Sequence, residues 1–93
     1  MLFLSTMRKA LGSVETRSLV GALEAADVMA KTADVTLASL NYVGSGIVAA
    51  VVEGDVAAVK AAVESGSAAA GRIAEVVAVH IIPRPVAEVR ELL

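Results

Sequence analysis

Two runs of mainly β-branched and aliphatic residues, 35–43 and 47–53, flank the triplet Gly44-Ser45-Gly46. Residues of this kind favour strands, and two strands joined by a short turn containing glycine form a β-hairpin. Because this pairing places the two runs side by side in antiparallel order, it fixes the middle of the fold. The segments on either side of the hairpin must pack around it.

A strand and a helix are expected before the hairpin. Residues 10–17 predict a strand with Gly12 as its weak point, and Ser18 is placed to cap a helix over residues 19–33. Helical spacing predicts an inward face on that helix made of Leu19, Leu23, Ala26 and Ala30.

A helix and a strand are expected after the hairpin. Asp55 is a favourable N-cap, and the inward seam of the second helix is predicted as Val56, Val59, Val63, Gly66, Ala70 and Ile73. Gly66 and Gly71 should let this helix lie close to the sheet. Residues 76–82 form a continuous apolar run, which is typical of a strand buried on both faces and is stopped by Pro83 and Pro85.

The predicted order is therefore β-α-β-β-α-β, the split βαβ arrangement of ferredoxin-like folds in the α/β (α+β) class, with a short C-terminal helix over 86–93. Residues 1–8 differ from the rest and are expected to be a disordered N-terminal extension, which leaves a single domain over 9–93. This fold hosts many unrelated functions, so function has to come from particular segments.

The composition predicts association. Of the 93 residues, 57% are hydrophobic but only 2% are aromatic, so the apolar content is mostly small aliphatic side chains. A chain of this length hides only about 60–65% of its unfolded surface. The remaining apolar surface would stay exposed on a single copy, and exposed apolar patches usually mark contact sites.

Several function classes are disfavoured. A net charge of −2 supplies no basic stripe for nucleic acid, and there is no cysteine for a disulfide or a thiolate metal site. No apolar run approaches the roughly 20 residues that span a bilayer, so no membrane association is expected. His80 is the single histidine, and we assign it no catalytic role. We expect no enzyme activity, cofactor or metal.

Five short motifs resemble the hexamer-forming shell proteins of bacterial microcompartments, the single BMC domain family. They are ALGSVETR at 10–17, GALEAAD at 21–27, VGSG at 43–46, GDVAAVKAA at 54–62 and AVHIIPRP at 78–85. The resemblance implies a flat homohexameric tile that packs edge to edge with other tiles in the shell of a cytoplasmic compartment. Partners would be further copies, other shell proteins and, as a further candidate, the encapsulated enzymes.

The resemblance also implies a pore. The triplet Gly44-Ser45-Gly46 would lie at the six-fold axis, with Ser45 as the polar lining. No charged residue lies between Leu40 and Val52, so the predicted pore is neutral and suited to small polar or anionic metabolites. Taken alone, the triplet indicates only a hairpin turn.

The same resemblance also implies contacts between the edges of neighbouring tiles. Asp27 and Lys31 by themselves indicate a surface ion pair one helical turn apart. The resemblance places the segment with Asp27 and Lys31 at the tile edge, where Lys31 lies against its counterpart in the next tile. It implies that Arg84, held between two prolines, reaches into the adjacent tile and donates hydrogen bonds to backbone carbonyls.

Three positions depart from the family pattern. Tyr42 stands where many members carry lysine, Val86 stands where histidine often follows the Pro-Arg-Pro segment, and Ile47 stands where carboxysome tiles commonly have arginine. The last departure favours a catabolic compartment. The alternative from another class is a small ferredoxin-like oligomer that binds a metabolite or regulates another protein.

Overall fold

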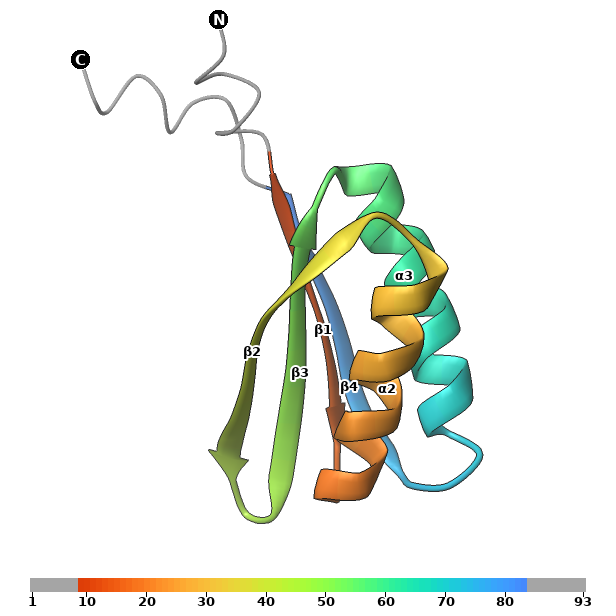
Figure 1. Cartoon of the computed structure of the whole chain (residues 1–93). Coiled ribbons are helices and arrows are strands. Elements are labelled where there is room, and N and C mark those ends of the chain that lie inside the picture. The colour runs from red at the N-terminus through yellow and green to blue at the C-terminus, as the bar shows by residue number, and fades with distance from the viewer. Residues whose placement is uncertain (1–8, 84–93) are drawn as a thin grey trace, which may run out of the picture.

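The computed structural model describes residues 9–83, in which two helices cover one face of a four-stranded antiparallel sheet (Figure 1). The elements are β1 (Ala10–Thr16), α2 (Leu19–Thr32), β2 (Val35–Gly44), β3 (Ile47–Gly54), α3 (Val56–Ala70) and β4 (Val76–Ile82). The strands lie in the order β2-β3-β1-β4, and each neighbouring pair is antiparallel. The predicted β-α-β-β-α-β order is confirmed. The expected extension over 1–8, Arg84 and the expected helix over 86–93 lie outside the described residues.

The first helix begins where the sequence predicts. Ser18 has an extended backbone, and its Oγ accepts a hydrogen bond from the Gly21 amide at 3.0 Å. The Thr16 hydroxyl in turn donates to the Ser18 carbonyl at 2.6 Å. The first bond satisfies an amide that a helix start would otherwise leave unpaired, and the second ties the end of β1 to the N-cap residue, so the turn from β1 into α2 is well defined.

The predicted inward face of α2 is correct for Ala26 but wrong for Leu19, Leu23 and Ala30. Leu19 and Leu23 are 41% and 48% exposed. The buried residues lie on a neighbouring stripe and are mainly small: Gly21, Ala22, Ala25, Ala26 and Met29. Ten of the fourteen residues of this helix are apolar when Gly21 is counted, so spacing alone did not distinguish the two stripes. The stripe with small side chains faces the core because the space between α2 and its neighbours admits alanine and glycine but few larger side chains.

Most of the predicted seam of α3 is buried, but its last member is not. The helix ends at Ala70 and Gly71 is its C-cap, so Ile73 falls in the following turn and is 56% exposed. The Gly71 amide donates to the Ser67 carbonyl, and the Ala74 amide donates to the Ala70 carbonyl. Gly71 therefore ends the helix and does not bring it close to the sheet.

Two glycines set how closely the elements approach. A Cβ at Gly66 would lie 2.5 Å from Met29 Cγ, so this glycine admits α2 against α3 and not, as expected, α3 against the sheet. The sheet meets α3 at Gly12 instead. A Cβ there would lie 2.5 Å from Val59 Cγ1 and 2.6 Å from Val63 Cγ2.

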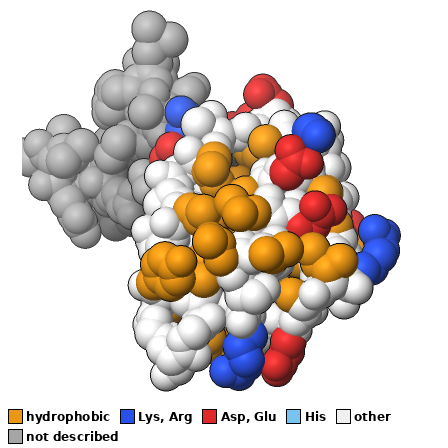
Figure 2. Space-filling view, turned by 60° about the horizontal axis from the view of Figure 1, so that its bottom comes forward, with side chains coloured by type: hydrophobic (Ala, Val, Ile, Leu, Met, Phe, Trp, Pro, Cys, Tyr) orange, Lys and Arg blue, Asp and Glu red, His pale blue; other side chains and the backbone are white. Residues whose placement is uncertain are grey.

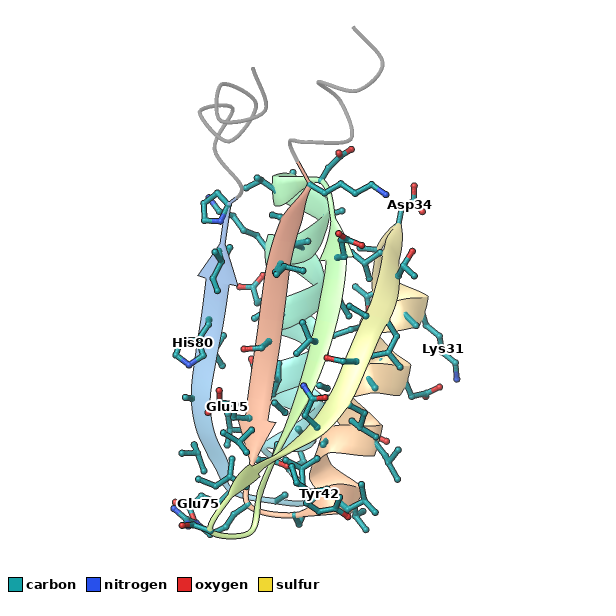
Figure 3. The ribbon with its side chains drawn as sticks, turned by 90° about the vertical axis from the view of Figure 1, so that its left-hand side faces the viewer. Glu15, Lys31, Asp34, Tyr42, Glu75 and His80 are labelled. Carbon is teal, nitrogen blue, oxygen red and sulfur yellow. The ribbon has the colours of Figure 1, made fainter. Side chains whose placement is uncertain are left out.

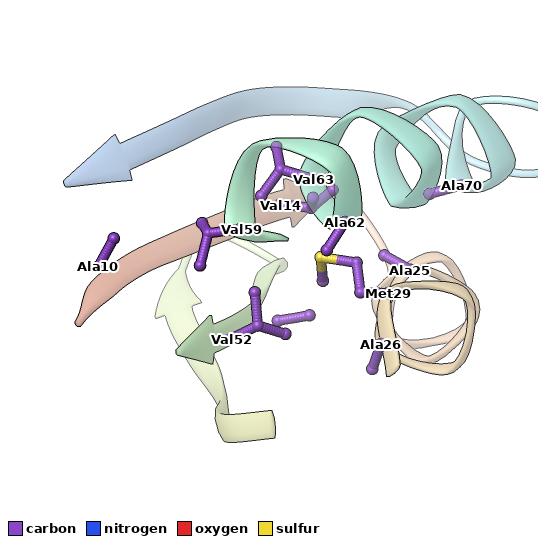
Figure 4. Packing of buried hydrophobic residues seen from close by; sticks show 11 residues of the cluster. Ala10, Val14, Ala25, Ala26, Met29, Val52, Val59, Ala62, Val63 and Ala70 are labelled. Carbon is purple, nitrogen blue, oxygen red and sulfur yellow. The ribbon is translucent and has the colours of Figure 1, made fainter. Parts of the chain in front are cut away.

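The core between the helices and the sheet is built from alanine and valine, with Met29 as its largest side chain (Figure 4). Its members are Ala10, Val14, Ala25, Ala26, Met29, Ala50, Val52, Val59, Ala62, Val63 and Ala70. No aromatic ring from residues 9–83 enters it, since Tyr42 is 74% exposed. Small side chains and close backbone approach thus give a thin core.

The expectation that β4 is buried on both faces is wrong for the single chain. β4 is an edge strand, and Val77, Val79 and Ile82 are 37%, 42% and 57% exposed. The helices cover only one face of the sheet, and chiefly its middle strands (Figure 1). The continuous apolar run therefore leaves apolar side chains uncovered on this chain.

Candidate pore hairpin and assembly surfaces

The β2–β3 hairpin closes with a two-residue turn. Gly44 pairs with Ile47, so Ser45 and Gly46 are the central residues, with φ values of 56° and 77°. Positive φ at both positions is the geometry of a type I′ turn, whose twist matches that of the flanking strands. Ser45 is unusual there because residues other than glycine seldom adopt this conformation.

The tip of this hairpin is exposed. Gly44, Ser45 and Gly46 are all exposed, and a Cβ added at either glycine would meet nothing within 4 Å. The tip projects from one end of the sheet (Figure 1). It carries no charged side chain, so what it presents is backbone, the Ser45 hydroxyl and flanking apolar residues.

Asp27 and Lys31 form the ion pair that their spacing predicts. Lys31 Nζ lies 3.0 Å from Asp27 Oδ2, and the two side chains are 74% and 55% exposed. Such an exposed pair contributes about 0.3–0.5 kcal/mol to stability, so it does little to hold the fold. Lys31 is in the last turn of α2, and its side chain lies on the side of the molecule about midway between Asp34 and Tyr42 (Figure 3).

The third predicted edge residue, Arg84, lies outside the described residues. The strand that leads to it ends at Ile82, which pairs with Leu11. This is the end of the sheet where Ala10 pairs with Gly54, opposite the hairpin. The structure thus places the start of the Pro-Arg-Pro segment at the end away from the hairpin, with Lys31 between that end and Tyr42.

His80 has a partner that the sequence did not reveal. His80 Nε2 lies 3.5 Å from Glu15 Oε2, on the sheet face that carries no helix. Ser13 pairs with His80 and Glu15 lies two residues further along β1, so the contact depends on the register between β1 and β4. The only indication of this contact in the sequence was the alternation of outward-facing residues along both strands.

The described residues offer little that resembles an active site. Within 9–83 there is no group of three or more His, Cys, Asp or Glu side chains that could hold a metal ion. In the same range no buried side-chain nitrogen or oxygen lacks a hydrogen-bond partner. None of the helices described is long and apolar enough to cross a membrane.

Large apolar side chains are exposed in several places. Some gather near the hairpin end of the molecule (Figure 2). Those at least 37% exposed are Leu19, Val20, Leu23, Leu37, Leu40, Tyr42, Val43, Ile73, Val77, Val79 and Ile82. On a chain this small, so much uncovered apolar surface is typical of proteins that associate.

The family model and the relatives that match this chain all concern microcompartment shell proteins. Residues 10–85 match the family model described as BMC domain. The chain is 52% identical over 86 residues to the microcompartment shell protein PduA of Salmonella typhimurium, covering 92% of each chain. It is 51% identical over 84 residues to the microcompartment shell protein EutM of Escherichia coli, covering 90% of this chain and 87% of the relative.

Two further matches extend this pattern. The carboxysome shell protein CsoS1A of Hydrogenovibrio crunogenus is 51% identical over 85 residues, which cover 90% of this chain and 88% of the relative. A solved structure of a microcompartment protein from Desulfitobacterium hafniense DCB superposes with a TM-score of 0.75 at 35% identity. The match covers 83% of this chain but only 42% of that longer one.

Proposed function

This chain belongs to the BMC domain family, and from that premise we propose that it is a structural shell protein that builds the wall of a bacterial microcompartment in the cytoplasm. Six copies would form a flat tile, and tiles would pack edge to edge with one another and with other shell proteins around encapsulated enzymes. The chain itself would catalyse no reaction.

One observation supports the six-fold tile beyond family membership. The exposed Gly44-Ser45-Gly46 tip lies at one end of the fold, and Lys31 of the Asp27–Lys31 pair lies on the side of the molecule, about midway between Asp34 and Tyr42. This arrangement suits a subunit of a ring, with the hairpin tip at the axis and exposed polar groups further out. The ion pair adds little to the stability of the fold, so a role at the tile edge is compatible with it.

Electron microscopy of the purified full chain, together with native mass spectrometry, tests this proposal. We expect a six-copy species and extended hexagonal sheets or tubes. Discrete trimers or dimers that bind a small metabolite would instead support the ferredoxin-like regulatory oligomer and refute the tile.

The pore proposal concerns Ser45. Six copies of the triplet would surround a narrow, uncharged opening lined by serine hydroxyls and glycine backbone, which suits small polar solutes. Backbone N–H groups that the glycines leave uncovered would add weak attraction for anions. The positive φ of Ser45 also limits what can line the opening, because bulky and β-branched residues are strained there.

Replacing Ser45 with leucine is expected to slow the passage of a small polar substrate into intact shells severalfold, because six apolar side chains would narrow and dry the opening. Ser45→Gly is the matched control, since glycine accepts this φ without strain and should leave passage equal or faster. The rate at which shell-enclosed enzyme consumes external substrate measures the effect. Equal rates for Ser45→Leu and the parent, with shells intact by microscopy, would remove Ser45 from the pore.

A further inference from the structure

The charged side chains are divided unequally between the two ends of the fold. The hairpin end, where β1 stops and β4 begins, carries two positive charges and one negative, on Arg17, Arg72 and Glu75. The opposite end has an open polar pocket, and its charged lining residues are one lysine and three carboxylates: Lys9, Asp34, Glu53 and Asp55. The whole chain carries a net charge of −2, so the hairpin end is positive although the chain is acidic.

The turn between α3 and β4 holds the backbone of Arg72 in a fixed place at this end. The Arg72 amide donates to the Ala69 carbonyl at 3.2 Å, and the Ala74 amide donates to the Ala70 carbonyl at 2.9 Å. A Cβ at Gly21 would lie 2.6 Å from Ala74 Cβ, so the turn also rests against the start of α2. Contacts on two sides therefore fix this turn, while the Arg72 side chain is exposed.

The two arginines of the hairpin end differ in their partners. Arg17 Nε lies 3.1 Å from Glu75 Oε1, and the Arg17 amide donates to the Glu75 carbonyl at 3.0 Å. The Arg72 guanidinium has no ion-pair or hydrogen-bond partner among the residues that the structure describes. The next carboxylate along β1 is Glu15, which is only 20% exposed and lies 3.5 Å from His80. Arg72 is therefore the uncompensated charge at this end.

This charge lies close to the hairpin tip. Figure 3 shows Glu75 on one side of the tip and Tyr42 on the other. In the sheet β4 is two strands away from β3, and neighbouring strands are about 4.8 Å apart, so the turn before β4 lies roughly 10 Å from the start of β3. The first carboxylate of α2, Glu24, lies five residues beyond Leu19, roughly 7.5 Å further along the helix.

We propose that Arg72 draws small anions to the pore, a proposal that rests on the proposed ring with Ser45 at its axis. The tip is uncharged and acts on the size and polarity of a solute, whereas a ring of Arg72 guanidinium groups acts on its charge. The favoured solutes are small carboxylates and inorganic anions. Arg72 also follows the end of α3, where a positive charge stabilises the helix dipole, but that role alone would not discriminate between solutes.

The size of the effect follows from Coulomb attraction reduced by salt. Six unit charges roughly 12 Å from an anion in water raise its local concentration about tenfold at about 0.01 M salt, where the Debye length is about 30 Å. At about 0.15 M salt the Debye length falls to about 8 Å, and the same charges give about twofold. The proposal therefore requires a strong dependence on salt.

Fluorescence quenching inside intact shells tests this proposal, with iodide as the anion and acrylamide as a neutral polar molecule. A labelled protein is enclosed in the shells, and stopped-flow mixing measures how fast each molecule reaches it. We expect Arg72→Gln to slow iodide entry about tenfold at about 0.01 M salt and about twofold at about 0.15 M salt. Acrylamide entry should not change, and Arg72→Glu should slow iodide further.

Three further variants sharpen the test. Glu75→Gln leaves the Arg17 charge without its partner, so iodide entry should become faster at low salt. Arg72→Lys keeps the charge and should restore the parent rate. Lys60→Gln is the matched control, because it removes one exposed positive charge from the first half of α3, toward the end opposite the hairpin. It should change the entry of neither molecule.

The outcomes separate this inference from the proposed function. Equal iodide entry into parent and Arg72→Glu shells at low salt, or equal slowing by Lys60→Gln, overturns the role of Arg72. If Ser45→Leu still slows acrylamide in such shells, the tile and its pore stand. Equal slowing of iodide and acrylamide by Arg72→Gln indicates a structural effect and also overturns the proposal. A chain that forms no six-copy species overturns both. Circular dichroism checks folding, and Arg72→Ala replaces any Arg72 variant that does not fold.

Discussion

Replacing Gly12 with valine is expected to lower the free energy of unfolding by about 3 kcal/mol. Valine suits a strand, and β-propensity alone would predict a gain of up to about 1 kcal/mol. The contacts oppose it, because a Cβ at this position would lie 2.5 Å from Val59 Cγ1 and 2.6 Å from Val63 Cγ2. Both valines are buried at 0% and 2% exposure and cannot turn away without displacing α3. Packing therefore outweighs propensity.

Thermal or denaturant unfolding at a fixed chain concentration measures this effect, since association shifts the apparent stability. Thr36→Val is the matched control, an exposed position on β2 where valine replaces a residue of nearly equal size. It should change the free energy of unfolding by less than about 0.5 kcal/mol. A Gly12→Val chain as stable as the parent would mean that α3 does not rest on β1 at this point.

Replacing Lys31 with alanine is expected to abolish extended sheets while leaving the six-copy species intact. The Lys31 side chain is 74% exposed and bonds only to Asp27 one turn away, so its loss should cost the fold about 0.5 kcal/mol or less. If Lys31 instead meets its counterpart across the tile edge, every edge of every tile loses a contact. An extended array multiplies a small loss per edge, so the effect on sheets should be close to all-or-none.

Negative-stain microscopy scores the sheets, and native mass spectrometry scores the six-copy species. Lys60→Ala is the control, because it removes an exposed lysine of the same charge from α3. Normal sheets from Lys31→Ala would exclude this residue from the edge. Loss of sheets from both variants would indicate that the change in net charge, and not the position of Lys31, prevents sheet formation.

The order of elements was predictable because breaks in the pattern mark it clearly. Ser18, the glycine turn at 44–46, Asp55 and Pro83 mark the limits of segments whose residue types favour one structure each. The buried face of α2 was not predictable in the same way. Its apolar residues form two adjacent stripes, and only the closeness of Gly66 to Met29 shows that the stripe with small side chains faces inward.

The candidate site also contains features that could be predicted from the sequence and features that could not. The hairpin turn and the Asp27–Lys31 ion pair depend on residues near one another in sequence, so local pattern was enough to predict that both would form. The Glu15–His80 contact depends on which strands are neighbours and in what register, and no local pattern contains that information. The positive φ of Ser45 was also unforeseen, because serine gives no signal for it.

The thin alanine and valine core has a consequence for how a cell would manage this protein. Few large side chains are buried, so a lone copy would hold its fold weakly, and contacts with neighbours in the proposed wall would supply much of the remaining stability. A copy without neighbours would open often, and proteases cut open chains. Surplus copies would be degraded while copies in the wall persist. The number of surviving subunits would then match the area of wall being built, without a dedicated regulator.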